Sequence, residues 1–338
     1  MQPKSRPTIR DVAKKAGVSR QTVSRVINHS KRVSPATRQR VEEAIADLGY
    51  RPDALAQSMA KGRSGTLACI APNLTDFTFA SLIDGAEVMA RDRGFFLLSA
   101  SAPDEGTFAA LVADLVTSRR AEGLIVINPF ADDRHLHLPK GFPTVFAGAR
   151  PRELETSSVA LDDVNAAKMA TQHLLALGHH QIGCITGPLV EDCAQDRCQG
   201  FHQALQEAGI TAEDRFIVSG NWRAQSGYAA FGKFVGTGRV PTAIFAQNDQ
   251  MAAGVLRAAR DQGIHVPEQL SVIGIDDIPM AGYLSPPLTT LRQDFQEIGR
   301  QATGLLIEAV NYASTQSRQL RLPAHMVIRR STSRVPAT

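Results

Sequence analysis

A chain of 338 residues, 43% hydrophobic and 21% charged, has the composition of a soluble protein large enough for two or three domain cores. The sequence has no apolar run as long as a membrane span, no secretory signal, and no disulfide or zinc spacing among its four cysteines. We therefore expect a cytoplasmic protein with no cofactor and no membrane partner. Residues 1–63 hold 14 Lys and Arg against 5 Asp and Glu, whereas the rest is mildly acidic. A basic segment joined to an acidic body is typical of DNA binding.

Residues 8–28 have the pattern of two short helices joined by a tight turn. Apolar residues recur at helical spacing over residues 9–16 and again over residues 23–27. Gly17 suits the left-handed turn that ends the first helix, and Ser19 is an N-cap for the second. This pattern predicts a helix-turn-helix, whose second helix lies in the major groove of DNA. The alternative, a helical hairpin in another kind of domain, does not explain the basic charge of residues 1–63.

A third helix is predicted from Pro35 to Leu48, with Ser34 as its N-cap, and it completes a DNA-binding headpiece over residues 1–50. Residues 51–64 form a predicted hinge, in which residues 53–61 are compatible with a helix. A helix of about nine residues is marginal by itself, so we expect the hinge helix to fold only when a partner holds it.

From Thr66 onward, buried-strand patterns alternate with helical patterns. Strands are predicted at residues 67–71, 95–99, 124–127, 144–147, 182–185, 216–218, 243–246 and 270–274, and helices near residues 79–93, 105–119, 196–208, 224–235 and 249–262. The alternation predicts an α/β fold with parallel sheets, and its repetition in two halves predicts two doubly wound subdomains with a cleft between them. We place this core at residues 65–331, followed by a tail at residues 332–338.

Ligands of doubly wound sheets bind at the carboxyl ends of the strands, so residues that follow strands are candidate ligand contacts. The candidates are Asn73, Phe77, Phe79, Asn128, Arg197, Trp222, Asn248 and Asp276. Asp, Asn and Arg hydrogen-bond vicinal hydroxyls, and Trp stacks on the apolar face of a sugar ring, so the set favours a mono- or disaccharide. Phe77 and Phe79 remain open as ordinary core residues, and capping of a helix that starts at Gln250 is the favoured role of Asp249.

The sequence resembles the lactose-repressor (LacI/GalR) family of bacterial transcription regulators over about residues 8–331. The resemblance is strongest at residues 11–26, 177–182, 241–252 and 285–290. It implies a homodimer, a nearly palindromic DNA operator, and a periplasmic-binding-protein-like core that senses a small molecule.

The resemblance also assigns roles in the headpiece and hinge. It implies that Arg20, Gln21 and Arg25 read bases, which agrees with the pairing of Arg with guanine and Gln with adenine. The residues implied to position phosphates are Ser19, Thr22, Ser24, Asn28 and Thr37. In the hinge it implies a wedge in the minor groove at Met59, with Ala56 one turn earlier.

The chain departs from the family pattern in two places, and its C-terminal residues differ from those of the lactose repressor. An acid found after the fourth strand in the lactose repressor is missing from residues 146–150, where Arg150 is expected to reach the ligand instead. Purine-binding relatives carry arginine and threonine where this chain has Glu191 and Cys193, which disfavours a purine. The C-terminal residues lack a leucine-heptad helix, so we expect a dimer.

The leading interpretation is a DNA-binding transcriptional regulator, most simply a repressor of sugar-utilisation genes, controlled by a small sugar. A nucleoside, a purine or a phosphorylated metabolite is the alternative effector. A transport-type sugar-binding protein would need an export signal and would not need a basic headpiece. An enzyme is disfavoured because no dinucleotide fingerprint, phosphate-binding loop or nucleophile elbow is present.

Overall fold

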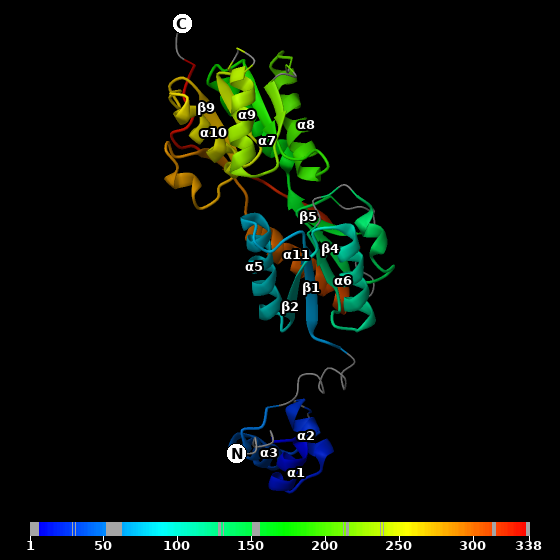
Figure 1. The fold of residues 1–338 in the computed structure, drawn as a ribbon. Helices are drawn as coiled ribbons and strands as arrows, with labels where there is room; N and C mark the ends of the chain where they lie inside the picture. The colour runs from blue at the N-terminus through cyan, green and yellow to red at the C-terminus, as the bar shows by residue number, and fades with distance from the viewer. Residues whose placement is uncertain are drawn as a thin grey trace. The chain divides into compact units, whose positions relative to one another are not determined.

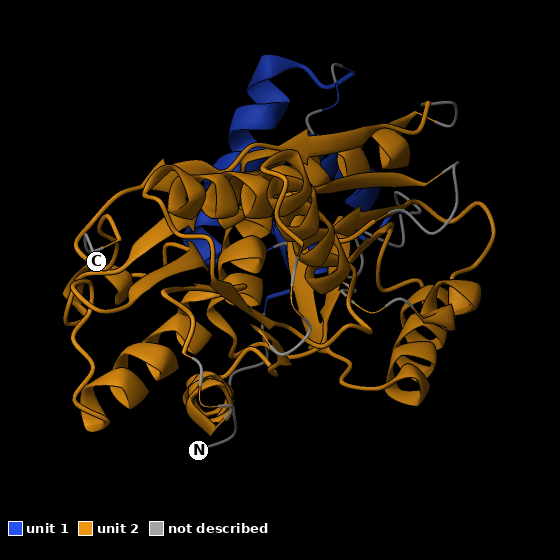
Figure 2. Ribbon diagram, turned by 90° about the horizontal axis from the view of Figure 1, so that it is seen from above, with its two compact units in different colours: residues 1–64 blue, residues 65–338 orange. Residues whose placement is uncertain are grey.

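The computed structural model describes residues 7–28, 30, 32–51, 63–127, 130, 132–150, 156–211, 213, 216–236, 238, 240–312 and 316–335. The chain divides into two compact units, residues 1–64 and 65–338 (Figure 2). Most of the predicted hinge, including Ala56 and Met59, lies outside the described residues, as does Asn128. Within the described residues, no helix has the length and apolar character needed to cross a membrane.

The described residues of the first unit form a three-helix headpiece. Its helices are α1 (Ile9–Ala16), α2 (Arg20–Ile27) and α3 (Pro35–Leu48). Val12, Val23 and Val41 each come from a different helix and meet in one buried cluster. Gly17 has a φ of 64° and ends α1, and the Ser19 hydroxyl accepts a hydrogen bond from Thr22 N at 3.1 Å at the start of α2. The helix-turn-helix and the third helix are therefore formed as the sequence predicts.

The core unit holds two six-stranded sheets (Figure 1). The first sheet has the order β11-β5-β4-β3-β1-β2 and the second has the order β12-β10-β9-β8-β6-β7. All pairings are parallel except that of β12 with β10. This arrangement confirms the predicted α/β fold with two parallel-sheet subdomains.

The first sheet contains β1 (Thr66–Ala71), β2 (Phe96–Ser101), β3 (Leu124–Val126), β4 (Thr144–Ala147), β5 (Ser157–Leu161) and β11 (Gln319–Leu322). Its helices are α5 (Phe77–Asp92), α6 (Glu105–Thr117) and α11 (Phe295–Asn311), with a short 3-10 helix η1 (Asp133–His137). Alternate residues of β1 serve opposite faces, because side chains alternate along a strand. Leu67 and Cys69 join the cluster of α5 and α11, whereas Ile70 joins the cluster of α6. Both faces of the sheet are thus buried.

The second sheet contains β6 (Ile182–Thr186), β7 (Ile217–Ser219), β8 (Ala243–Ala246), β9 (Ser271–Asp276), β10 (Thr289–Arg292) and β12 (His325–Val327). Its helices are α7 (Asp163–Ala176), α8 (Asp192–Glu207), α9 (Ala224–Gly236) and α10 (Asp249–Asp261), with η3 (Ala281–Tyr283). Phe245 of β8 packs on the side of α7 and α8, and Ile244 packs on the side of α9 and α10. This sheet is therefore also covered on both faces.

The two subdomains are not the successive halves that the sequence suggests. The chain passes between them after β5, after β10 and after β11, so that α11 and β11 return to the first sheet. Helix α11 packs against α5 at two glycines: a Cβ on Gly85 would lie 2.0 Å from the carbonyl oxygen of Gln296, and a Cβ on Gly299 would lie 2.0 Å from that of Leu82. Three connecting segments of the chain therefore join the subdomains.

The predicted tail is part of the core as far as Val335. Ser333 N donates to Ser271 Oγ at 3.0 Å, and Val335 N donates to the carbonyl of Leu177 at 3.1 Å. The buried ring of His179 lies 3.0 Å from the Ser333 carbonyl oxygen through its Nε2. The core boundary at residue 331 was therefore placed too early, because these bonds are made to residues distant in sequence.

Candidate functional site

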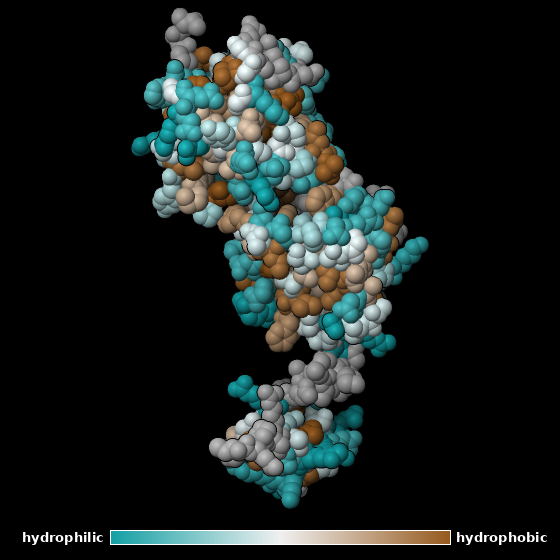
Figure 3. All heavy atoms as spheres, in the orientation of Figure 1, coloured by the Kyte–Doolittle hydropathy of each residue, from teal (hydrophilic) through white to brown (hydrophobic). Residues whose placement is uncertain are grey.

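The headpiece presents the first turn of α2 as its candidate DNA-reading surface. Arg20, Gln21 and Arg25 are exposed, and their side chains make no hydrogen bond or ion pair with the described residues. The face of the headpiece drawn in Figure 3 is largely hydrophilic. These three side chains are thus available to reach base edges, and the reading role remains a prediction.

The residues expected to position phosphates are partly engaged in local hydrogen bonds. Thr22 Oγ1 lies 3.0 Å from Ser19 Oγ, and Ser34 Oγ donates to Thr37 Oγ1 at 2.9 Å. Asn28 Nδ2 donates to the Ser24 carbonyl at 2.9 Å. Their hydroxyl and amide groups therefore shape the ends of α2 and α3 as well as facing outward.

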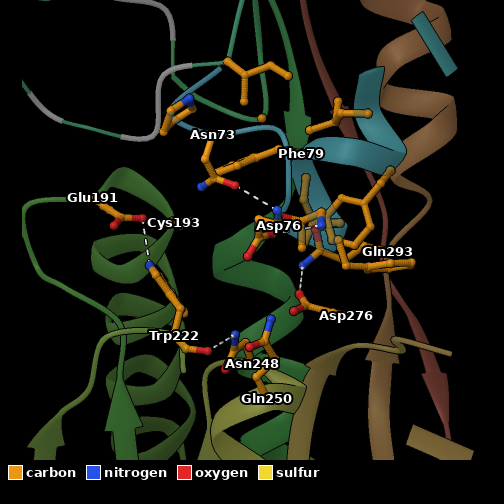
Figure 4. A pocket seen from close by; sticks show the side chains of 18 of the residues that line it. Asn73, Asp76, Phe79, Glu191, Cys193, Trp222, Asn248, Gln250, Asp276 and Gln293 are labelled. Carbon is orange, nitrogen blue, oxygen red and sulfur yellow. Dashed lines mark hydrogen bonds between the residues drawn. The ribbon is translucent and has the colours of Figure 1, made fainter. Parts of the chain in front are cut away.

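The core unit contains a cavity of about 650 Å³ lined by residues of both subdomains (Figure 4). It is lined by seven of the predicted ligand contacts, which are Asn73, Phe77, Phe79, Arg197, Trp222, Asn248 and Asp276. The residues of the first subdomain follow β1, and those of the second follow β7 or β8, end β9, or lie on α8. Within each sheet, the parallel strands end at the same edge, and this brings together residues that are far apart in the sequence.

Arg197 and Asp276 form the charged floor of the cavity. Arg197 Nε donates to Asp163 Oδ1 at 2.6 Å, its Nη1 donates to the Gln247 carbonyl, and Nη1 lies 4.0 Å from Asp276 Oδ1. Burial alone would lower the pKa of Arg197, but the surrounding carboxylates, Asp163 foremost, raise the pKa above its ordinary value. Arg197 is therefore a fixed cation in the cavity.

Asp276 is held in an unusual conformation. Its φ is 125°, its side chain is only 4% exposed, and its Oδ1 accepts a hydrogen bond from Gln293 Nε2 at 2.9 Å. Burial raises the pKa of Asp276 well above its usual range, and the charge of Arg197 opposes that rise. A left-handed conformation at a residue other than glycine costs about 1–3 kcal/mol, and such strain clusters at binding sites.

Trp222 is fixed by groups on α8 and at the N-termini of α8 and α10. Its indole Nε1 donates to Glu191 Oε2 at 2.8 Å, and its carbonyl accepts from Asn248 Nδ2 at 3.0 Å. The guanidinium carbon of Arg197 lies 5.6 Å from the centroid of the ring. Burial raises the pKa of Glu191, and the hydrogen bond from the indole opposes that rise. The ring is thus positioned before any ligand arrives.

Asn248, and not Asp249, is the N-cap of α10. Asn248 Oδ1 accepts a hydrogen bond from Met251 N at 2.9 Å. Asp249 is the first residue of the helix, and its buried carboxylate accepts from Thr290 Oγ1 at 2.5 Å and from Ile278 N at 2.9 Å. The predicted cap was therefore one residue too late, although Asp249 does have a structural role.

The first subdomain contributes one polar group and two aromatic rings from the predicted set. Asn73 Oδ1 accepts from Asp76 N at 2.8 Å, which leaves its amide nitrogen for a ligand. The Phe77 ring meets Phe295 edge-on, with 6.2 Å between centroids. Phe79 lines the cavity and also packs against the buried cluster of α5 and α11. It can therefore be a core residue and a ligand contact at once.

Arg150 does not line the cavity, contrary to expectation. Its guanidinium is paired with Asp196 on α8, and Nε donates to Asp196 Oδ2 at 3.2 Å. Its backbone N donates to Asp192 Oδ2 at 3.2 Å. Two carboxylates of the facing subdomain thus draw Arg150 to a separate contact between the subdomains.

The sequence analysis missed several polar residues of the cavity wall, among them Asp76, Gln250 and Gln293. Asp76 is the N-cap of α5, with Oδ1 accepting from Thr78 N at 2.9 Å, and its Asp-x-Thr pattern was a usable signal for a helix starting at Phe77. Gln293 follows β10, whose sequence TTLR has no continuous apolar run that would predict a buried strand.

Known proteins are similar to this chain over nearly its full length. Residues 8–53 match the profile of the bacterial regulatory proteins of the lacI family, and residues 171–332 match the periplasmic binding protein-like domain. The HTH-type transcriptional repressor CytR of Escherichia coli (strain K12) is 35% identical over 334 residues, which cover 97% of each chain.

Two solved structures are similar over nearly the full length. The lac repressor dimer bound to operator and the anti-inducer ONPF has a TM-score of 0.89 and 31% identity, and the match covers 97% of this chain and 99% of that one. The complex of the transcriptional regulator CelR with cellobiose has a TM-score of 0.75 and 32% identity, covering 96% of this chain and 100% of that one.

Proposed function

The chain belongs to the lacI family of bacterial regulatory proteins, and we propose that a small sugar in its core cavity controls how tightly its headpiece binds an operator. The protein is a DNA-binding transcriptional regulator and not an enzyme, as its relatives are repressors. The identity of the effector, the contacts to DNA and the dimeric state are the parts that we propose.

One observation carries the sugar proposal: Arg197, Asp276 and Trp222 converge on one cavity. A fixed guanidinium and a buried carboxylate offer a donor and an acceptor to neighbouring hydroxyls, and the indole offers an apolar face for a sugar ring. The volume of about 650 Å³ suits a mono- or disaccharide. Cellobiose is the ligand in the CelR complex, which supports the same class of molecule here.

For the DNA contacts, we propose base reading by Arg20, Gln21 and Arg25, and phosphate positioning by the neighbouring hydroxyl and amide groups. The positioning set is Ser19, Thr22, Ser24, Asn28 and Thr37. The basic charge of residues 1–63 supports this assignment. The proposed wedge at Met59, with Ala56, lies outside the described residues and rests on the family resemblance alone.

We further propose that the chain acts as a homodimer on a nearly palindromic operator, since two headpieces read two half-sites. The similar lac repressor structure is a dimer on its operator. The edge strand β2 exposes Phe96 and Leu98, which lie on one face because they are two residues apart. These residues are candidates for part of the dimer contact.

Trp222, the only tryptophan of the chain, tests the effector proposal directly. Its fluorescence should change on titration with at least one sugar from a panel of mono- and disaccharides, and that sugar should alter operator affinity. Asp276→Asn should weaken binding about tenfold or more, because a buried carboxylate acceptor is lost. Asp261→Asn, on the exposed end of α10, is the control. A response to a nucleoside and to no sugar would refute the sugar assignment.

A further inference from the structure

The walls of the cavity carry more negative than positive charge. Among the described lining residues, the acids are Asp76, Asp163, Glu191 and Asp276, and the only cations are Arg197 and Arg223. Neither lysine nor histidine is found in this described lining. The cavity should therefore repel a ligand that carries a negative group and attract a ligand that carries a positive group.

Arg197 compensates only part of that charge. It forms a 2.6 Å hydrogen bond with Asp163 and lies 4.0 Å from Asp276. Neither Asp76 nor Glu191 is within 4.0 Å of a cationic group of the described residues. Asp76 and Glu191 thus form no ion pair with the described residues, although the charge of Arg197 acts on Glu191 at longer range and lowers its pKa.

These two carboxylates belong to different subdomains. Asp76 begins α5 in the first subdomain, and Glu191 precedes α8 in the second. Burial raises the pKa of Glu191 and of Asp276, and the charge of Asp76 raises both further, so all three groups lie within electrostatic range of one another. Figure 4 shows all three at the cavity.

Glu191 and Asp276 each also have a carboxylate oxygen that receives no hydrogen bond from the described residues. Glu191 is 9% exposed and Asp276 is 4% exposed. Glu191 uses Oε2 to accept from Trp222, and Asp276 uses Oδ1 to accept from Gln293. Among the described residues, Glu191 Oε1 and Asp276 Oδ2 receive no hydrogen bond. Both oxygens border the cavity and can accept hydrogen bonds, so the cavity suits a ligand rich in donors.

We propose that the effector carries an amino group, protonated when bound, in the part of the cavity bounded by Asp76, Glu191 and Asp276. An ammonium group has three donors and a positive charge, which match the open oxygens and the excess of negative charge. The hydroxyls of the same ligand face Arg197, and its ring faces Trp222. An amino sugar has this chemistry, whereas a sugar phosphate is excluded by charge. This inference rests on the proposed sugar effector and specifies its class.

Matched ligands test the inference on the full-length protein. Calorimetric titration compares glucose, glucosamine and glucose 6-phosphate, and the corresponding galactose series. We expect the amino sugar of at least one series to bind about tenfold tighter than its neutral parent, because an ammonium group forms charge-assisted hydrogen bonds that a hydroxyl does not. Asp76→Asn and Glu191→Gln should each bring the two affinities closer together. Asp104→Asn, at the exposed N-cap of α6, is the matched control and should leave their ratio unchanged.

Equal affinity for amino and neutral sugars, or tighter binding of the phosphate, would overturn the amine while leaving the sugar effector standing. If no compound of the panel binds, the ligand-free protein decides the question. The substitution Asp76→Asn keeps a side-chain oxygen that can cap α5, and Glu191→Gln keeps an acceptor for the indole of Trp222. Both substitutions should then raise the melting temperature of the core by relieving repulsion. A fall in melting temperature for both would refute the excess of negative charge.

Discussion

Trp222 owes its position to the absence of a side chain at Gly187. A Cβ at Gly187 would lie 2.0 Å from the indole ring, so only glycine lets the ring pack beside the end of β6. Gly187→Ala should displace the ring and weaken effector binding about tenfold, with a shift in tryptophan emission. Gly232→Ala is the control, because a Cβ at that helical glycine meets nothing within 4 Å. Equal effects of the two substitutions would show that Gly187 is not needed for the position of the ring.

Gln21 is the residue at which base reading is tested most sharply. Gln21→Ala should change the preferred base at one position of each half-site, at a cost of roughly 1–3 kcal/mol at the contacted pair. Selection from randomised operators measures the preference, and Gln39→Ala on α3 is the control. An unchanged consensus for the α2 substitution would mean that Gln21 does not read a base.

Asp249 should make stability depend on pH. Burial raises the pKa of Asp249 to about 7, against about 4 in an unfolded chain. The folded state therefore holds the proton more tightly, and the free energy of unfolding falls as pH rises from about 4 to about 7. Asp249→Asn keeps the shape and removes the titration, so urea unfolding across this range should show a shallower decline. An unchanged or steeper decline would contradict the assignment.

At the scale of the element, Ser331 shows how the C-terminal segment is held on the second sheet. Ser331 is fully buried, and its hydroxyl accepts from Thr289 N at 2.8 Å and donates to the Val272 carbonyl at 2.6 Å. Ser331→Ala should lower the stability of the core by about 1–3 kcal/mol, because two buried backbone groups lose a partner. A chain ending at Arg330 should lose more. Calorimetry checks both, with Ser118→Ala at the exposed end of α6 as the control.

Local signals explain which elements the sequence predicts. Gly17, Ser19 and Ser34 mark helix ends through their own backbone and side-chain chemistry, so the headpiece is predicted closely. Buried strands such as β1 and β8 are continuous apolar runs and are equally visible. The strands β10 (TTLR), β11 (QLRL) and β12 (HMV) include polar residues and carry no comparable signal. Their places follow from pairing with distant strands.

The candidate site shows the same division between local and distant information. Residues at or just beyond the ends of apolar strands, such as Asp276 at the end of β9, are found from the sequence. Gln293 is missed because β10 is missed, and Arg150 is misassigned because its partner Asp196 is 46 residues away. A side chain's neighbours in a cleft depend on how two subdomains face each other, which periodicity does not encode.

At the scale of the whole core, Arg150 and Asp196 join the two subdomains beside the cavity. Arg150 follows β4 in the first subdomain, and Asp196 lies on α8 in the second. Both nitrogens of the guanidinium edge meet the carboxylate, and the charge of Asp196 with its hydrogen bond raises the pKa of Arg150. A contact that exists in one arrangement of the subdomains stabilises that arrangement over any in which the contact is broken.

The pair should therefore bias the coupling between effector and DNA. It is partly exposed, so its expected contribution is about 0.5–1 kcal/mol. Arg150→Ala and Asp196→Ala should each change effector affinity two- to fivefold, and operator affinity should respond through the same equilibrium. Because each substitution removes the same ion pair, the double substitution should change the affinities little more than either single substitution does. Exchanging the two charges, with Arg150→Asp and Asp196→Arg together, should restore much of the original response. Fully additive effects in this cycle would show that the ion pair does not connect the arrangement of the subdomains to the effector.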